Sequence, residues 1–289
     1  MNNEYTARDP QRRLVLQELG FQEEPFTRAA DPRFLYLSSG HGRILNGVQD
    51  VIELRRGLAV VEGAYGLGKS SIGRRLESIY RLQVLTYQVA YLYSSGYESE
   101  FAALNDICYA LGVGPRRGLT KQWRELETYL VDQTQNNKNV VIIIDDAQQM
   151  NPGTLTFVHK IYNFESTRIG KLAQVILLGQ PEIRRIFDER PEIGSRVDVW
   201  YKMNELTLEE TFGLINFRSS VAGRKDPFLT RTALVTLWES SRGVPRSIVS
   251  ICSTAVDLMG QRGKSVADDD IIQQAVAIHI ETRIPQSEQ

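Results

Sequence analysis

The strongest chemical signal in the sequence is a stretch that fits the phosphate-binding pattern G-x-x-x-x-G-K-[ST] without a mismatch, Gly63-Ala64-Tyr65-Gly66-Leu67-Gly68-Lys69-Ser70. Its glycines permit a tight bend in which successive backbone N–H groups point at one spot, as a phosphate group requires. The Lys69 ammonium would reach the β- and γ-phosphates, and the Ser70 hydroxyl would bind Mg²⁺. Together with Ser71, these residues are the predicted ATP-binding loop.

The residues on both sides of this stretch suit the same interpretation. An apolar run at residues 58–61 precedes it, and apolar side chains recur at helical spacing over residues 71–80. A strand, a glycine-rich loop and a helix, in this order, place the positive end of the helix dipole at the phosphates. The sequence therefore predicts a nucleotide site after the strand at residues 58–62.

A second signal lies where another apolar run ends in two acids. Residues 139–144 read Asn-Val-Val-Ile-Ile-Ile, which indicates a buried parallel strand, and Asp145 and Asp146 follow directly. Acids at the end of such a strand, downstream of a phosphate loop, are typical of a Walker B motif. Asp145 would hold Mg²⁺ through water, and Asp146 would orient and deprotonate the attacking water.

Gln180 follows the next predicted strand, at residues 172–178, and stands just before Pro181. A polar side chain at this position, beside Walker B, would hold the γ-phosphate or the water. The alternative is that Gln180 only forms the turn before the proline.

The spacing of apolar residues predicts an α/β fold with a parallel sheet and a second, all-helical part. Further strands are expected at residues 83–93 and 197–203, and helices at 12–19, 41–55, 98–112, 116–135, 153–165 and 181–189. After Asn204, amphipathic helices are expected at 207–222, 230–241, 244–260 and 268–282. The predicted domains are an N-terminal arm over 1–40, an ATPase core over 41–204, a helical lid over 205–283 and a disordered tail over 284–289.

The arm contains two segments rich in proline and aromatic residues, at residues 20–26 and 31–36. They are interpreted as a strap that covers the core, as one wall of an adenine pocket, or as both.

Composition limits the function less than the motifs do. The chain has 289 residues and a net charge of −1, so a lone subunit is not expected to bind DNA tightly, although a local basic patch stays possible. Cys108 and Cys252 lie in apolar helical patterns and are expected to be reduced core residues of a cytoplasmic protein. No apolar run approaches the roughly 20 residues of a membrane span, and residues 1–13 lack a signal-peptide core.

Taken in order, the motifs resemble those of an AAA+ ATPase. They are the phosphate loop, Ile-Ile-Ile-Asp-Asp-Ala-Gln at 142–148, Leu-Leu-Gly-Gln-Pro-Glu at 177–182 and Gly-Val-Pro-Arg at 243–246. Within that superfamily the chain is similar to the ExeA-like branch, which also holds the TnsC, TniB and MuB ATPases of DNA transposition. Pro25-Phe26, residues 31–36 and His41 match the N-terminal segment of that branch, and the similarity covers about residues 20–282. The resemblance implies an AAA+ P-loop αβα sandwich with a parallel sheet and a small C-terminal α-helical lid.

The resemblance also implies roles for single residues. It assigns Walker A, Walker B and the first sensor position, respectively, to Lys69 with Ser70, to Asp145 and to Gln180. Arg246 takes the second sensor position on the lid, or is a surface cation near a helix start. Arg196 falls where a neighbouring subunit's arginine finger is expected, with Arg190 as competitor and a surface salt bridge as the alternative. A finger supplied in trans would complete the site only in a homo-oligomer, either a ring or a helical filament.

The chain departs from the branch in two respects. The family usually has Glu where this chain has Asp146, and the shorter side chain predicts slow hydrolysis and a long-lived ATP-bound state. Secretion-type members continue into a membrane span and a cell-wall module, whereas this sequence ends after the predicted lid, which favours a role in transposition.

The leading functional hypothesis is an ATP-dependent regulator of transposition that assembles on duplex DNA and recruits a transposase or target-selector protein. Its predicted DNA contacts are Arg116, Arg117, Thr120 and Lys121, which could equally be a solvated loop and helix start. The alternatives are an ExeA-type ATPase that assists secretion-system assembly and a slow nucleotide switch protein.

Overall fold

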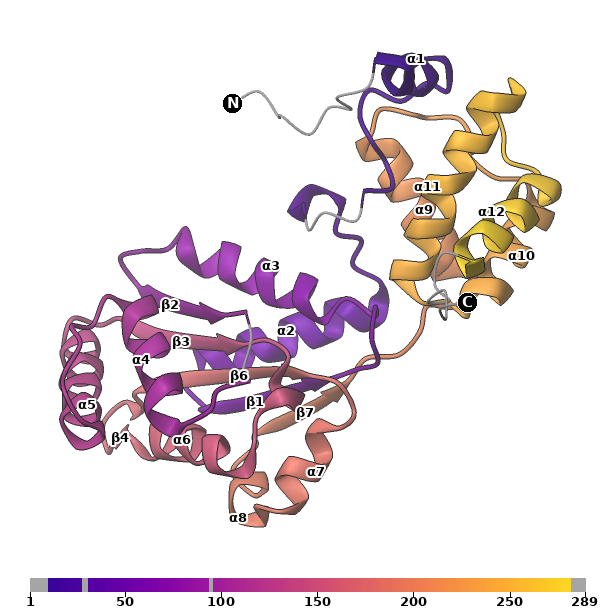
Figure 1. The fold of residues 1–289 in the computed structure, drawn as a ribbon. Coiled ribbons are helices and arrows are strands. Elements are labelled where there is room, and N and C mark those ends of the chain that lie inside the picture. The colour runs from indigo at the N-terminus through magenta and orange to yellow at the C-terminus, as the bar shows by residue number, and fades with distance from the viewer. Residues whose placement is uncertain (1–9, 28–30, 94–95, 282–289) are drawn as a thin grey trace. The chain divides into compact units, whose positions relative to one another are not determined.

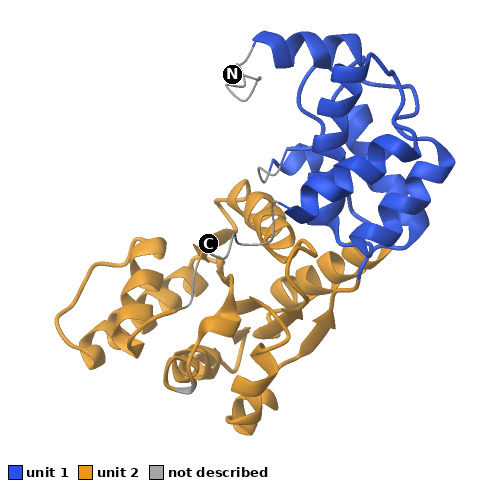
Figure 2. Ribbon diagram, turned by 45° about the vertical axis from the view of Figure 1, so that its right-hand side comes forward, with its two compact units in different colours: residues 1–38, 205–289 blue, residues 39–204 orange. Residues whose placement is uncertain are grey.

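The structure, a computed structural model, describes residues 10–27, 31–93 and 96–281, which belong to two compact units (Figure 2). The core unit spans Ser39–Asn204. The helical unit joins the chain before Ser39 to the chain from Glu205 onward, so the predicted arm and the predicted lid helices belong to one unit. The predicted disordered tail, residues 284–289, lies outside the described residues.

Five parallel strands form the sheet of the core unit, in the order β2-β3-β6-β1-β7 (Figure 1). They are β1 (Leu58–Glu62), β2 (Tyr87–Leu92), β3 (Asn139–Ile144), β6 (Ala173–Gly179) and β7 (Val199–Lys202). The three central strands are buried at every position because helices cover both faces of the sheet. The predicted α/β class with a parallel sheet is confirmed.

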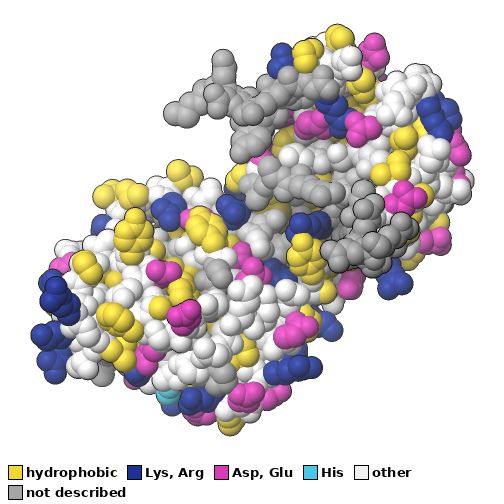
Figure 3. Space-filling model, in the orientation of Figure 1, with side chains coloured by type: hydrophobic (Ala, Val, Ile, Leu, Met, Phe, Trp, Pro, Cys, Tyr) yellow, Lys and Arg dark blue, Asp and Glu magenta, His cyan; other side chains and the backbone are white. Residues whose placement is uncertain are grey.

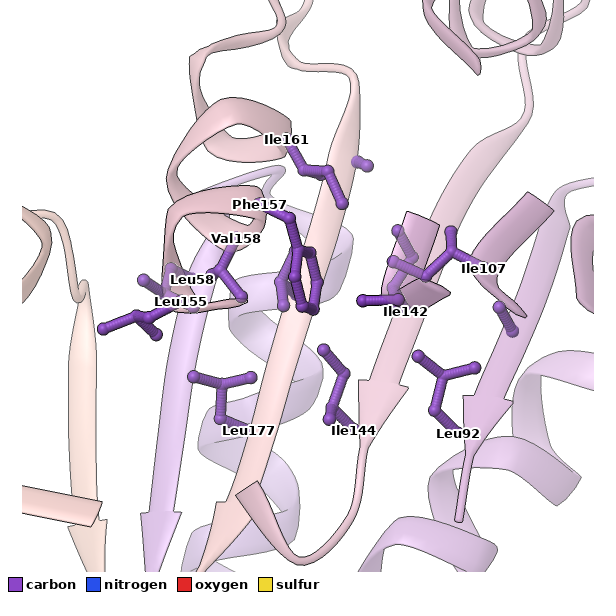
Figure 4. Close-up of a cluster of buried hydrophobic side chains, with 14 of the residues drawn as sticks. Leu58, Leu92, Ile107, Ile142, Ile144, Leu155, Phe157, Val158, Ile161 and Leu177 are labelled. Carbon is purple, nitrogen blue, oxygen red and sulfur yellow. The ribbon is translucent and has the colours of Figure 1, made fainter. Parts of the chain in front are cut away.

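Helices α4 (Glu100–Leu111), α5 (Leu119–Gln135), α6 (Pro152–Asn163) and α7 (Ile183–Asp188) contribute to the core on one face of the sheet. Alternate strand residues such as Leu58, Ile142 and Leu177 point toward Phe157 and its neighbours on this face (Figure 4). Helices α2 (Ser39–Glu53) and α3 (Lys69–Arg81) cover the opposite face (Figure 1). There α3 approaches β6 so closely that a Cβ atom on Gly73 would lie 2.5 Å from Leu178 Cδ1.

Several predicted boundaries are wrong at their ends. The strand predicted at 83–93 begins only at Tyr87, because the preceding residues form a turn in which the Thr86 N–H donates to the Gln83 carbonyl. The helix predicted at 41–55 ends at Glu53, followed by Arg55 in the left-handed region with φ 53°. The short helix α8 (Pro191–Gly194) and a small hairpin of β4 (Glu165–Ser166) and β5 (Gly170–Lys171) were not predicted.

The helical unit contains α1 (Pro10–Glu18), α9 (Leu208–Val221), α10 (Arg231–Ser241), α11 (Pro245–Arg262) and α12 (Asp269–Glu281). Its core includes Phe21, Phe26 and Phe34 from the arm, which pack with Phe228 and the C-terminal helices. The proline- and aromatic-rich segments therefore pack as a strap within the helical unit. Their alternative role as an adenine-pocket wall stays a prediction.

Both cysteines are buried and free, Cys108 in the core unit and Cys252 in the helical unit, as expected of reduced core residues. The cytoplasmic location remains a prediction. Among the described residues, no helix combines the length and the apolar character that crossing a bilayer demands.

Candidate nucleotide site

The loop between β1 and α3 has the backbone that its sequence predicts. Gly66 and Gly68 adopt φ values of 84° and 104°, in the left-handed region that glycine enters without steric cost. Gly63 is needed for a different reason, because a Cβ atom there would lie 2.9 Å from Met203 Cβ. Substitution of any of these glycines would therefore distort the loop.

Lys69 is the first residue of α3, and its buried side chain folds back over the loop. Its Nζ donates to the carbonyls of Gly63 at 2.7 Å and Ala64 at 3.0 Å. Burial lowers the pKa of this ammonium, while the nearby carboxylates of Asp145, Asp146 and Glu182 act in the opposite direction. The arrangement holds a cation inside the glycine loop and within the field of three acids.

Asp145 follows β3 and is held by a hydrogen bond at each carboxylate oxygen. Oδ2 accepts from the Tyr91 hydroxyl at 2.9 Å, and Oδ1 accepts from the Asp146 N–H at 3.0 Å. Burial, and then the Asp145 charge, raise the pKa of Tyr91, so its hydroxyl stays a donor. A fixed carboxylate and the exposed hydroxyl of Ser70 are the hard oxygen ligands that Mg²⁺ prefers. The residues present therefore fit a magnesium ion.

The structure brings together the two predicted hydrolysis residues, Asp146 and Gln180. The Gln148 side chain donates from Nε2 to Asp146 Oδ1 at 3.1 Å and accepts from the Gln180 N–H at Oε1 at 2.9 Å. Asp146 has φ 49° and ψ 38°, which is uncommon for a residue with a Cβ atom and tolerated best by Asn and Asp. The ends of β3 and β6 are thus joined through one glutamine.

His41 supports the phosphate loop from α2. Its Nε2 lies 2.9 Å from the Leu67 carbonyl, and because a carbonyl only accepts, Nε2 carries the proton. A Cβ atom on Gly68 would lie 3.4 Å from the same nitrogen. The imidazole therefore fixes the loop and limits the space beside Gly68.

The structure does not bring Arg196 together with Lys69 and Asp146. Arg196 precedes β7, and its guanidinium lies 5.9 Å from the centre of the Tyr162 ring. The nearby Asp198 N–H donates to Leu58, the first residue of β1, whereas the phosphate loop follows the last residue of β1. Arg196 thus lies near the amino ends of the strands, whereas the nucleotide loop of its own core unit lies at the carboxyl end of β1. Arg190 is paired with Glu192 at 3.5 Å.

Arg246 belongs to the helical unit, in the first turn of α11. The preceding turn is fixed by Gly243, whose carbonyl accepts from the Leu206 N–H at 2.8 Å, while the Trp238 Nε1–H donates to the Leu206 carbonyl. The predicted second sensor thus begins a well-anchored helix.

Not every cation among the predicted DNA contacts is available to bind a phosphate group. Arg116 makes a two-point ion pair with Glu125, with both nitrogen–oxygen distances at 3.0 Å. Arg117, Thr120 and Lys121 are exposed around the start of α5. Figure 3 shows Lys and Arg side chains gathered over α5, although the Arg116 charge is largely compensated. The residues around the start of α5 therefore offer DNA less positive charge than their sequence suggests.

Sequence reasoning missed the supporting residues Tyr91, Gln148 and Glu182. Gln148 and Glu182 lie inside the motifs at 142–148 and 177–182, so attention to the polar positions of those motifs could have found them. Tyr91 gave no local signal, because its contact with Asp145 depends on the pairing of β2 with β3.

Residues 52–187 match the family model of an AAA domain. The chain is 30% identical over 254 residues to general secretion pathway protein A of Aeromonas hydrophila, a match that covers 86% of this chain and 46% of that protein. The chain thus spans less than half the length of that relative.

Two solved structures from Aeropyrum pernix share the fold. The ORC2 protein in ADPNP-ADP complexes has a TM-score of 0.68 at 14% identity, covering 91% of this chain and 74% of its own. The ORC1 protein in complex with DNA has a TM-score of 0.62 at 14% identity, covering 96% and 73%, respectively. At these identities the likeness concerns the fold alone. Residues 52–187 thus resemble an AAA domain in sequence, the longer match is to a secretion pathway protein, and the fold is the one seen in the two ORC proteins.

Proposed function

We propose that this protein binds ATP with Mg²⁺ and hydrolyses it to ADP and phosphate. The observation that carries the proposal is the buried Lys69 ammonium, held inside the glycine loop beside the carboxylates of Asp145 and Asp146. The Lys69 ammonium bonds two loop carbonyls, and in a complex with ATP it would bond the β- and γ-phosphates instead.

In this mechanism each residue has one task. Lys69 and the loop N–H groups bind the phosphates, and Ser70 with Asp145 would hold Mg²⁺, which neutralises charge on the phosphate oxygens. Asp146 accepts the proton of the attacking water, and the Gln180 side chain orients that water or the γ-phosphate. Because Asp146 is shorter than the usual Glu, hydrolysis is expected to be slow.

The direct test is ATP binding and phosphate release by the wild type and by Lys69→Ala, each in the presence of Mg²⁺. The variant should lose ATP binding, because a single point charge meets the β- and γ-phosphates. Normal ATP affinity in Lys69→Ala would refute the phosphate-loop assignment.

We further propose that ATP-bound subunits form a homo-oligomer, either a ring or a helical filament, and bind duplex DNA as a regulator of transposition. In this role the protein would recruit a transposase or target-selector protein, as the resemblance to the TnsC, TniB and MuB ATPases suggests. The exposed cations at the start of α5 support DNA binding, as does the fold shared with a protein solved in complex with DNA.

A second candidate is an ATPase that assists assembly of a secretion system. The similarity to general secretion pathway protein A favours this role, because it extends over 254 residues at 30% identity. Retention on duplex DNA with ATP but not with ADP separates the two proposals. Wild-type protein that does not bind duplex DNA in the presence of ATP at low salt would contradict the transposition role and favour the secretion role.

A further inference from the structure

One side chain, that of Gln148, connects the two strand ends that carry the proposed hydrolysis residues. Gln148 lies in the 3₁₀ turn Ala147–Gln149 that follows Asp146. Its amide donates to the Asp146 carboxylate and accepts from the backbone N–H of Gln180. Only one orientation of the amide satisfies both partners, because a carboxylate only accepts and a backbone N–H only donates.

The backbone around this bridge is arranged to bring the two strand ends close. A Cβ atom on Gly179, the last residue of β6, would lie 3.4 Å from the Gln148 backbone nitrogen and 2.9 Å from Ile183 Cδ1. Glycine at this position therefore lets the end of β6 approach the turn that carries Gln148.

The Asp146 backbone is fixed as well. Its N–H donates to Asp145 Oδ1 at 3.0 Å, and its carbonyl accepts from the Gln149 N–H at 2.9 Å. These bonds hold the left-handed conformation of the Asp146 backbone. The bond from Gln148 Nε2 restrains the carboxylate itself.

We propose that Gln148 is a positioning residue for ATP hydrolysis, which holds the Asp146 carboxylate in place and makes it move together with Gln180. The inference rests on the proposed ATPase function. Gln148 bonds the backbone N–H of Gln180, so this bond leaves the Gln180 side chain available for the proposed contact with the nucleotide or the water. A change at either strand end is thereby transmitted to the other through one amide.

Gln148→Met tests the proposal, because methionine has a similar length and makes neither bond. Turnover should fall by about tenfold or more, the effect expected when a charged group loses a hydrogen bond. ATP affinity should stay within about twofold, because Gln148 is not placed on the phosphates. Gln135→Met, the same change at an exposed glutamine at the end of α5, is the matched control and should keep wild-type turnover.

Two further measurements separate positioning from a general structural effect. Amide hydrogen exchange of Gln180 should accelerate in Gln148→Met, but stay protected in Gln148→Glu, which retains an acceptor yet cannot donate to Asp146. In an Asp146→Asn background, Gln148→Met should cause a clearly smaller additional loss of turnover than in the wild type, because the carboxylate that it restrains is already removed.

The outcomes distinguish this inference from the proposed function. An active wild type together with a Gln148→Met variant of unchanged turnover would overturn the inference and leave the ATPase assignment intact. The inference would also fail if the same fold-loss appeared in the Asp146→Asn background, or if Gln180 exchange were unchanged in Gln148→Met. A wild type that hydrolyses no ATP would overturn both.

Discussion

At the scale of single residues, we propose that the Asp146 carboxylate is the group that separates hydrolysis of ATP from its binding. Asp146→Asn should keep ATP binding and oligomers but lower turnover by at least about a hundredfold, because an amide cannot take the proton of the water. Steady-state phosphate release and equilibrium ATP binding measure the two effects separately. Asp188→Asn, an exposed acid in α7, is the matched control. Turnover within about twofold of wild type in Asp146→Asn would show that another group is the base.

The same residues show how far the sequence could predict the site. The placement of Lys69, Asp145 and Asp146 could be predicted because it depends on local order, a strand followed by a loop. The contacts from Tyr91 to Asp145 and from Gln148 to Gln180 could not be identified, because they join strands that pair only in the folded sheet. Residue types in a motif therefore predicted where these side chains lie, while the groups that contact them could be found only from the order of the strands.

At the scale of elements, the arm is attached to the C-terminal helices by arginines as well as by its aromatic core residues. Arg224 donates to the carbonyls of Leu19, Asp226, Pro227 and Ser265, and its guanidinium lies over Phe21 and Phe228. Arg218 donates to the carbonyls of Phe34 and Thr27, and burial lowers its pKa to about 10. Composition suggested a strap as one of two interpretations, but the attachment of these segments depends on arginines about 200 residues away that no local pattern marked.

Arg224→Met should therefore destabilise the helical unit by about 3 kcal/mol, since carbonyls from four residues lose a charged donor in a buried site. Urea unfolding followed by hydrogen exchange in α11 reports on this unit specifically. Arg231→Met, the same substitution at an exposed position of α10, should leave stability almost unchanged. Equal stability of the two variants would contradict the anchoring role of Arg224.

At the scale of the whole molecule, the position of Arg196 is relevant only in an assembly. Because Arg196 lies near the amino ends of the strands, whereas its own phosphate loop follows the carboxyl end of β1, we propose that it acts on nucleotide in a neighbouring subunit. Arg196→Ala should bind ATP normally yet fail to hydrolyse it. Mixing it with Asp146→Asn should recover some turnover, because one subunit's intact Asp146 then meets a neighbour's intact Arg196.

The control for this experiment is a mixture of the Arg190→Ala protein with the Asp146→Asn protein, measured at the same total protein concentration. If the Arg196→Ala mixture stays inactive although both proteins co-assemble, the finger lies elsewhere and Arg190 is the next candidate. Recovery in the Arg190→Ala mixture alone would move the assignment to that residue.

The proposed DNA binding also depends on the proposed assembly, because one subunit with a net charge of −1 and few available cations is expected to bind DNA weakly. An oligomer repeats the start of α5 in every subunit, so weak phosphate contacts add through multivalency. Arg116, paired with Glu125, should contribute less than the exposed Arg117 and Lys121. The Thr120 hydroxyl, also exposed, could add a phosphate hydrogen bond. Since none of these residues implies readout of base edges, binding should tolerate any sequence and weaken steeply with salt.

Arg117→Ala combined with Lys121→Ala should abolish most ATP-dependent DNA binding and reduce the slope of log affinity against log salt by about one per lost contact. ATP binding should remain, because the start of α5 is distant from the phosphate loop in the sequence. In the sheet, β6 also separates β3, the strand after α5, from β1, the strand before the phosphate loop. Arg116→Ala alone should have a smaller effect, because its charge is already shared with Glu125. The control removes equal charge elsewhere, Lys225→Ala with Arg231→Ala, both exposed in the helical unit. Fluorescence anisotropy on duplex DNA over a range of salt measures all four proteins. If wild type and the Arg117–Lys121 variant bind equally well, DNA binding stands and the contact surface lies elsewhere on the core or helical unit.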